Sequence, residues 1–409
     1  MKKKQDGWLD EIIKEVKREI RHRKGVELFG RQINEVKVFG KTLHIDNKVP
    51  GLILDTFDNL GFETKDGQTP KIIPGGKRRT DYGWHLIINL PPGKSYQQVK
   101  AKQNFFADAT KAWVDLDWIK GYVHMDVLME ELEAQIDFAW NPLPYLNKMA
   151  LPWPIGYTHG NKLLVVDLAK MPHCLAGGAT NFGKSSFILV LVYALLKLKQ
   201  ICPNRVFIAL ADLKGLDFYQ LSNHILVLED EGTIFTFMKR LHKEYERRKA
   251  ILRKCGLKKI QGYKGDDLPY LVFIIDEFAE ITSKEILKTI NRAVRLYRAV
   301  GIHLVVATQR PSIVGGVMDG DTRAQFPARV CFKVSCEADS RMILGEQYNQ
   351  AAWLPGDVPG RAFFNFGIEM KMVQSMFISE EMEPLLLADL AGNDRRWGFE
   401  LNTKRLKPR

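Results

Sequence analysis

The sequence has few cysteines and no long hydrophobic segment. Its 409 residues include five cysteines, an odd number without a CxxC pair, which argues against a disulfide framework and a zinc site. The longest uninterrupted apolar run, Phe187 to Leu196, is about half as long as a bilayer span. These absences predict reduced thiols and a cytoplasmic protein without a membrane-spanning helix of its own.

The formal net charge is +12, but most of the chain carries little of this positive excess. Residues 1–24 contain nine Lys or Arg against five Asp or Glu, and residues 395–409 contain six against one. The basic excess is therefore concentrated in two tails, and the pI alone is a weak argument for nucleic-acid binding. With 45% hydrophobic and 26% charged residues, the chain has a globular composition and enough length for two domains.

Proline density suggests where those domains meet. Pro142, Pro144, Pro152 and Pro154 are too closely spaced for a helix or a central strand. We therefore predict the following organisation: a basic amphipathic helix at 1–24, a small N-terminal α/β domain at 25–141, a proline-rich linker at 142–154, a larger domain at 155–385 and a basic tail at 386–409. The apolar face of residues 6–23 either packs on its own domain or docks a partner protein or anionic lipid, which would place the protein peripherally at a membrane.

Short apolar runs alternate with helical stretches beyond residue 155. The clearest runs are 173–176, 205–213, 270–275, 303–308 and 329–334. Such runs, separated by helices, are typical of a parallel sheet covered on both faces. We expect an α/β fold with a parallel sheet flanked by helices.

A glycine-rich motif follows the run at 173–176 and begins an apolar helix. Its sequence fits GxxxxGK[ST] in the strand–loop–helix context of a P-loop, which indicates ATP as ligand. Lys184 would reach the β- and γ-phosphates, and the Ser185 hydroxyl would bind Mg²⁺. The predicted nucleotide-binding residues are Gly178, Ala179, Thr180, Asn181, Phe182, Gly183, Lys184, Ser185 and Ser186.

Two further strands end in polar residues. The run at 271–275 is followed by Asp276, which we expect to hold Mg²⁺ with Ser185, and by Glu277, which would polarise the attacking water as general base. The run at 303–308 is followed by Gln309, placed to sense the γ-phosphate or to position water. The presence of Glu277 favours hydrolysis over nucleotide binding alone.

Several segments resemble the motor of the FtsK/SpoIIIE DNA translocases. They are 166–173 running into 176–186, Glu246-Arg-Arg-Lys, Asp276-Glu-Phe-Ala-Glu280, residues 298–312, and Ser340-Arg-Met-Ile-Leu344. The resemblance covers roughly residues 150–380 and implies a RecA-like P-loop ATPase over 155–385, usually hexameric, that pumps double-stranded DNA through a central pore. Without membrane helices or a winged-helix module, the chain resembles the short motors of conjugative elements, plasmids and phages.

In such rings an arginine from the neighbouring subunit completes each active site, and family position offers Arg298 and Arg341 as candidates. We therefore predict a ring-forming, ATP-hydrolysing DNA translocase that serves DNA transfer, packaging or maintenance of a mobile element, with double-stranded DNA and copies of itself as partners. Two alternatives remain at this stage: a nucleotide-gated DNA-binding scaffold that does not translocate, and a protein-secretion ATPase of the type VII kind.

Overall fold

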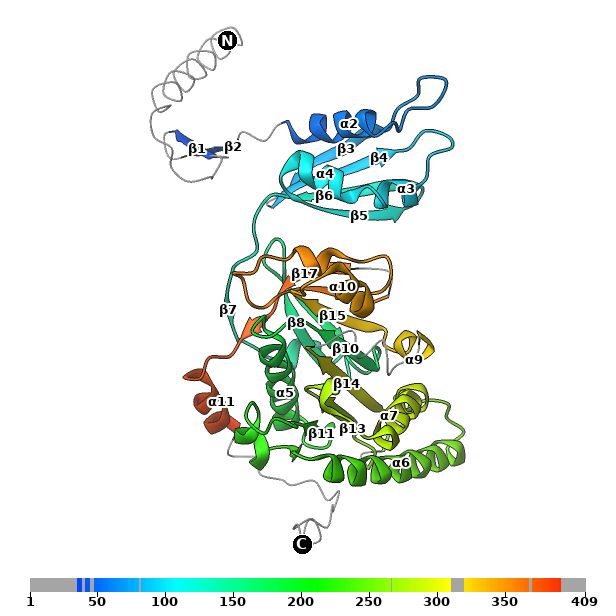
Figure 1. Cartoon of the computed structure of the whole chain (residues 1–409), viewed down its shortest axis with the longest axis vertical. Helices are drawn as coiled ribbons and strands as arrows, with labels where there is room; N and C mark the ends of the chain where they lie inside the picture. Colours follow the sequence, from blue (N-terminus) through cyan, green and yellow to red (C-terminus); the bar gives the residue numbers. More distant parts are fainter. Residues whose placement is uncertain are drawn as a thin grey trace. The chain divides into compact units, whose positions relative to one another are not determined.

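The computed structural model describes residues 35–38, 41–44, 48–80, 82–265, 267–309, 320–367 and 370–390. The chain divides into two compact units, Met1–Met129 (unit 1) and Glu130–Arg409 (unit 2). Figure 1 shows each unit built around its own sheet. The predicted amphipathic helix at 6–23 lies outside the described residues.

Unit 1 contains a four-stranded antiparallel sheet with the order β3-β4-β6-β5. Its strands are β3 (Lys71–Thr80), β4 (Gly83–Asn89), β5 (Trp113–Ile119) and β6 (Tyr122–Leu128), and its helices are α2 (Val49–Asn59), α3 (Tyr96–Lys100) and α4 (Gln103–Thr110). Phe57 from α2 and Phe106 from α4 pack with ring centroids 4.6 Å apart in its core, beside Leu86 and Met125. A separate hairpin pairs β1 (Glu35–Val38) with β2 (Lys41–His44). The predicted small α/β domain thus consists of a four-stranded sheet and helices that share one hydrophobic core.

Unit 2 contains a ten-stranded mixed sheet with the order β12-β11-β13-β14-β10-β15-β16-β17-β8-β9. Six neighbouring strands are parallel: β12 (Leu226–Leu228), β11 (Val206–Ala211), β13 (Tyr270–Ile275), β14 (Ile302–Thr308), β10 (His173–Gly177) and β15 (Ala328–Phe332). The other four continue the sheet in antiparallel pairing: β16 (Arg361–Asn365), β17 (Met370–Gln374), β8 (Pro152–Thr158) and β9 (Lys162–Asp167). The prediction of an α/β fold is confirmed, but the sheet is mixed rather than wholly parallel.

Helices cover both faces of this sheet (Figure 1). On one face lies α5 (Lys184–Ile201), whose Phe187 packs against Trp153 of β8. On the other face lie α6 (Glu231–Lys254) and α7 (Lys284–Leu296), and Phe237 of α6 packs against Phe273 of β13 with centroids 4.9 Å apart. Every residue of β13 is buried, because each side of the strand meets a helical layer.

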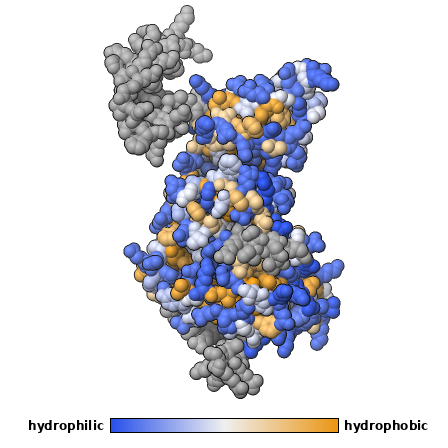
Figure 2. Space-filling model, in the orientation of Figure 1, coloured by the Kyte–Doolittle hydropathy of each residue, from blue (hydrophilic) through white to orange (hydrophobic). Residues whose placement is uncertain are grey.

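Unit 2 also contains several shorter helices and strands. They are α9 (Gly320–Ala324), α10 (Glu337–Leu344), α11 (Met382–Leu390), and a parallel pair formed by β7 (Ile136–Asp137) and β18 (Met376–Phe377). No helix among the described residues is long and apolar enough to cross a bilayer. On the face shown in Figure 2, hydrophilic side chains cover most of the described surface and apolar ones form small patches.

The proline-rich stretch is not the boundary that the sequence suggested. The two units divide after Met129, and the predicted linker at 142–154 belongs to unit 2. Pro152 and Pro154 lie in β8, where Trp153 is fully buried. A bulge between Pro154 and Gly156 accommodates the prolines. Among the described residues, β8 and β17 share a single register pair, Gln374 with Tyr157, so few ladder bonds on that side need the N–H groups that the prolines lack.

The start of the predicted basic tail is also part of unit 2. Helix α11 continues to residue 390, whereas the sequence suggested that the domain ends at 385. Leu390 is 5% exposed and belongs to the same core cluster as α5, and Gln200 donates a hydrogen bond to the Asp389 carbonyl at 2.9 Å. Apolar packing thus extends the unit beyond residue 385.

Candidate nucleotide-binding site

The glycine-rich motif forms a loop between β10 and α5. Gly183 caps the helix with φ 100°, and Asn181 has φ 67°, a left-handed conformation that Asn adopts more readily than most residues. A Cβ on Gly183 would lie 2.7 Å from the Gly360 nitrogen, so only glycine fits there. Among the described residues, no hydrogen bond uses the amide N–H groups of residues 180–186. A helix start with free N–H groups is suited to bind phosphate.

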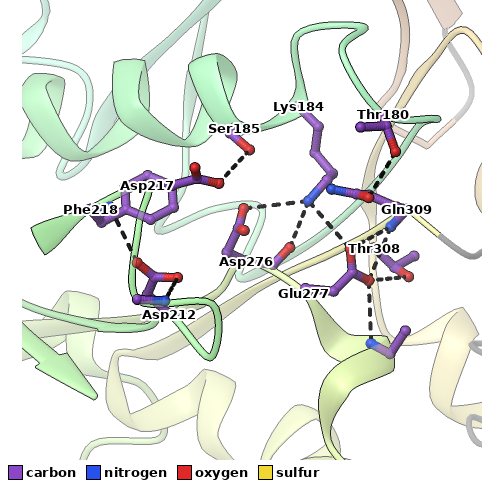
Figure 3. Close-up of polar contacts among 12 residues, drawn as sticks. Thr180, Lys184, Ser185, Asp212, Asp217, Phe218, Asp276, Glu277, Thr308 and Gln309 are labelled. Atoms are coloured by element: carbon purple, nitrogen blue, oxygen red, sulfur yellow. Dashed lines mark hydrogen bonds and ion pairs between the residues drawn. The ribbon is translucent and has the colours of Figure 1, made fainter. Parts of the chain in front are cut away.

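Lys184 points from the first turn of α5 to the tip of β13 (Figure 3). Its Nζ donates to the Asp276 carbonyl at 2.8 Å and lies 3.4 Å from Asp276 Oδ1 and 3.7 Å from Glu277 Oε2. The side chain is only 3% exposed. The structure therefore joins the P-loop lysine to both predicted carboxylates, across 92 residues of sequence.

Asp276 and Ser185 have the chemistry of a magnesium site. Asp276 Oδ2 is buried and has no hydrogen-bond partner among the described residues. Burial raises the pKa of this carboxyl, and nearby Lys184 opposes that rise. Ser185 Oγ lies 3.4 Å from Asp217 Oδ2 on the other side. Hydroxyl and carboxylate oxygens are the ligands that Mg²⁺ prefers, so these residues fit the ion.

Glu277 is held in one orientation by the end of the next strand. Its Oε1 accepts a hydrogen bond from Thr308 Oγ1 at 2.8 Å, and its Oε2 accepts one from the Gln309 amide at 2.9 Å. The residue is 5% exposed. A carboxylate fixed by two donors beside the P-loop lysine has the position that a general base requires.

Gln309 connects the P-loop with the tip of β14. The Thr180 hydroxyl donates to Gln309 Oε1 at 3.0 Å (Figure 3). Strand β14 lies between β13 and β10, so its end separates Glu277 from the loop. The predicted proximity of Gln309 to Asp276 follows from this strand order.

The P-loop and Gln309 line a cavity of about 590 Å³, whereas Asp276 and Glu277 are buried behind Lys184 and do not line it. Seven of the predicted nucleotide-binding residues line it: Ala179, Thr180, Asn181, Gly183, Lys184, Ser185 and Ser186. Gly178 and Phe182 do not line it. A Cβ on Gly178 would lie 2.7 Å from Phe332, and the Phe182 side chain packs on the core while its carbonyl accepts from the Gly360 amide. Gly178 and Phe182 therefore contribute to the shape of the loop rather than to the lining of the cavity.

Sequence reasoning missed several residues that line this cavity: Ala134, Gln135, Lys214, Asp217, Pro359, Gly360 and Gln374 to Phe377. Asp217 and Lys214 come from the loop after β11, and Gln374 to Phe377 come from β17 and β18. Asp212 shapes the first loop, because its carboxylate accepts from the Gly215 and Phe218 amides. The sequence did offer one signal for Asp217, because this residue follows the buried strand β11, which lies next to β13. No local sequence feature marked the residues from β17 and β18 as part of the site.

The two candidate arginines lie at different ends of the sheet. Arg298 is in the turn at 297–300 that precedes β14, at the opposite end of that strand from Gln309. Arg341 is in α10, which follows β15 and packs against the P-loop strand, since a Cβ on Gly177 would meet Ile343 at 2.4 Å. Arg341 donates to Glu337 at 2.6 Å. Neither arginine lines the cavity.

Comparisons with known proteins agree with this geometry. The FtsK/SpoIIIE family matches residues 140–267 and 261–313. The chain is 37% identical over 218 residues to the DNA translocase FtsK of Chlorobaculum tepidum, covering 48% of this chain and 27% of that protein. It is 34% identical over 272 residues to the DNA translocase FtsK of Treponema pallidum, covering 62% and 32%. It thus spans about a third or less of these relatives.

Two solved structures share the fold. The conjugation coupling protein TcpA of pCW3, determined with ATPγS, has a TM-score of 0.56 at 20% identity, covering 84% of this chain and 99% of that one. The cytoplasmic domain of the type VII secretion ATPase EccC of Thermomonospora curvata has a TM-score of 0.51 at 26% identity, covering 60% and 31%. The P-loop, the carboxylate pair and the match to the FtsK/SpoIIIE family thus lie in one segment, residues 140–313, of a unit with an α/β P-loop ATPase fold.

Proposed function

We propose that this chain is an ATP-hydrolysing motor that moves along double-stranded DNA. The observation that carries the proposal is Glu277, fixed by Thr308 and Gln309 within 3.7 Å of the P-loop lysine. A protein that only bound nucleotide would not need an oriented base there. The DNA cargo rests on the relatives, which are named DNA translocases.

Each residue then has a definite task. The free amides of residues 180–186 and Lys184 bind the phosphates, and Ser185 and Asp276 hold Mg²⁺, which neutralises phosphate charge when bound. Glu277 accepts a proton from water as its oxygen attacks the γ-phosphorus. The bond from that phosphorus to the bridging oxygen breaks, and ADP leaves with the electron pair.

We further propose that copies of the chain assemble head to tail in a ring, and that this ring is needed for turnover but not for nucleotide binding itself. The phosphate-binding loop is at the carboxyl ends of the parallel strands, and Arg298 is at the amino end of β14. Contact between two different edges is a heterologous interface, which closes into a ring when the rotation between neighbouring copies permits it. Arg298 fits a contribution to a neighbour's site, whereas Arg341 is already paired with Glu337. A hexamer and service to a mobile element are the finer parts of this proposal, and they rest on the resemblance to short family motors.

The test is ATP hydrolysis by the full chain with and without linear duplex DNA, together with displacement of a triplex-forming strand. We expect duplex DNA to stimulate hydrolysis and the triplex to be displaced only with ATP. The Lys184→Ala variant should do neither, because it lacks the ammonium group that we propose binds the phosphates. A wild-type chain that hydrolyses ATP without any response to duplex DNA would refute the DNA motor.

A second candidate function has specific support. The likeness to EccC, at 26% identity, favours a protein-secretion ATPase as the alternative cargo assignment. Stimulation by DNA separates the two, since a secretion ATPase would not respond to it. DNA stimulation without triplex displacement would instead indicate the non-translocating scaffold.

A further inference from the structure

The loop that follows β11 brings a further carboxylate to the nucleotide site. Strand β11 is parallel to β13, and their last residues, Ala211 and Ile275, are paired. The Asp276 amide also donates to the Ala211 carbonyl at 3.2 Å. The loops after the two strands therefore begin side by side, and Figure 3 shows Asp217 on the side of Asp276 that is turned away from Glu277.

The backbone on both sides of Asp217 is held in place. The carboxylate of Asp212 accepts hydrogen bonds from the Gly215 amide at 3.0 Å and from the Phe218 amide at 3.2 Å, which closes the loop. Gly215 has φ 68°, a left-handed conformation that glycine adopts without strain. Phe218 is 1% exposed and belongs to the core of unit 2. The Asp217 side chain itself is exposed and lines the nucleotide cavity.

Asp217 contacts the hydroxyl group that fits Mg²⁺. Ser185 Oγ donates to Asp217 Oδ2 at 3.4 Å. A hydroxyl group has one hydrogen to donate and two lone pairs on its oxygen. Because the hydrogen points to Asp217, both lone pairs remain available to a cation. In the described part of the chain this is the one hydrogen bond of the Asp217 carboxylate, so its other oxygen is available to a water molecule.

The charges of Asp217 and Asp276 repel each other across the site. Burial raises the pKa of the Asp276 carboxyl, Lys184 opposes this rise, and Asp217 adds to it. Asp276 is 1% exposed, and its Oδ2 has no hydrogen-bond partner among the described residues. A buried acceptor without a partner costs free energy. A divalent cation would satisfy this oxygen and remove the repulsion between the two carboxylates.

We propose that Asp217 is a positioning residue for the Mg²⁺ that accompanies the nucleotide. The proposal rests on the proposed function, which supplies the nucleotide, and it adds a residue from the β11 loop to Ser185 and Asp276. Asp217 orients the Ser185 hydroxyl and accepts a hydrogen bond from one of the waters that Mg²⁺ retains. Within the described residues no group of three His, Cys, Asp or Glu side chains could hold a metal ion, so phosphate oxygens must complete the site.

The first test measures metal affinity without turnover, in the full chain with Asp217→Asn. Mn²⁺ is the probe, titrated into a mixture with the chain in excess over ATPγS and followed by electron paramagnetic resonance. We expect the Kd for Mn²⁺ to rise roughly 10- to 100-fold, as is usual when a residue that orients a metal ligand is replaced. Without nucleotide, neither wild type nor variant should bind Mn²⁺ specifically. An unchanged Kd in the presence of ATPγS would overturn the proposal.

ATPγS binding in EDTA separates this role from simple repulsion of phosphate. We expect Asp217→Asn to change that affinity less than about twofold, because Lys184 and the loop amides are intact. A carboxylate that only repelled phosphate would give the opposite result. The variant would then bind metal-free ATPγS more tightly and keep its affinity for Mn²⁺, which would refute a role at the metal.

Asp357→Asn is the matched control for loss of a negative charge. Asp357 is exposed and lies two residues before Pro359, which lines the nucleotide cavity, but it does not line the cavity itself. Its replacement should leave the Kd for Mn²⁺ within about twofold of wild type, since no metal ligand contacts it. Equal losses in the two variants would overturn the proposal, because they would reflect overall charge. Asp217→Glu keeps the carboxylate and should lose less affinity than Asp217→Asn; a larger loss would contradict us.

The second test follows ATP hydrolysis as a function of Mg²⁺ concentration. In Asp217→Asn the Mg²⁺ concentration for half-maximal turnover should rise roughly tenfold or more, while kcat at saturating Mg²⁺ should recover to within about threefold of wild type. A loss of kcat that no Mg²⁺ concentration restores would overturn a positioning role. If the wild-type chain hydrolysed no ATP, the proposed function would fail, and the Mn²⁺ titration would still decide this inference. Normal wild-type hydrolysis with an unchanged Mn²⁺ affinity in Asp217→Asn would remove this inference alone.

Discussion

The sheets of the two units are buried in different ways. In β4 of unit 1, Trp84, Leu86 and Ile88 are buried while His85 and Ile87 between them are half-buried, so one face of the antiparallel sheet packs and the other stays open. In unit 2, every residue of β13 and β14 is buried. A strand covered on both faces can place polar groups only at its ends, and that is where the nucleotide site lies.

The open face of unit 1 carries polar side chains along its strands instead. Asp126 pairs across the sheet with His85, whose Nδ1 lies 2.7 Å from Asp126 Oδ1. His124 Nδ1 lies 3.2 Å from the other ring nitrogen of His85. Within the part of the chain that the structure describes, no group of three such side chains could hold a metal ion. Polar residues on an open face satisfy one another, whereas those at strand ends in unit 2 surround a cavity.

The largest expected effect is the loss of ATP turnover when Glu277, at the end of β13, is replaced. Glu277→Gln should reduce ATP turnover roughly 10²- to 10⁴-fold, because the amide cannot accept the proton from water. Binding of ATPγS should persist, since Lys184 and the loop amides remain. Single-turnover hydrolysis and equilibrium binding measure the two effects, and normal turnover would refute the assignment of Glu277 as base.

A smaller effect is expected at the buried ion pair of α6. Arg248→Gln should lower the free energy of unfolding by roughly 3 kcal/mol, because it removes a buried partner of Glu244 and the contact to Val300. Arg247→Gln is the matched control and should cost less than about 1 kcal/mol, because that arginine is half-exposed. Urea unfolding compares them, and equal losses would contradict the structural difference.

Acid should destabilise unit 2 through its buried histidines. Burial lowers the pKa of His303 to about 3. The unfolded chain therefore takes up the proton first, so this stability is complete above pH 6.5 and is lost as pH falls toward 3. The loss at pH 5 is roughly 2 kcal/mol. Urea unfolding at pH 7 and 5 should show it, and His303→Leu should reduce the pH dependence; an unchanged dependence would argue against burial as the cause.

The smallest expected effect tests whether the units are independent. Ile53 of α2 is fully buried in unit 1, so Ile53→Val should cost about 1 kcal/mol there. Hydrogen exchange should accelerate in peptides of unit 1, and ATPγS affinity should stay within twofold of wild type. A matched variant, Ile274→Val in β13, should shift exchange in unit 2 instead. Loss of ATPγS binding in the Ile53 variant would show that the units are coupled.

Local patterns predicted the parts of the site that are continuous in sequence. The P-loop and Asp276-Glu277 each combine a buried strand with the polar residues that follow it, and the structure joins them through Lys184. Other parts were less predictable. The prolines of β8 indicated a linker because their bulge and sparse pairing cannot be seen in the sequence. Asp217 was missed because its role depends on β11 lying beside β13.

The sequence by itself determined that this chain has a P-loop, a carboxylate pair after a buried strand and an α/β fold. These are short-range features, since loop conformation and strand burial depend on neighbouring residues. Only the tertiary structure decided that Thr308 and Gln309 orient Glu277, and that Arg298 lies with three other cations at the far end of the sheet. Those contacts depend on strand order and direction, which are fixed by packing across the whole domain.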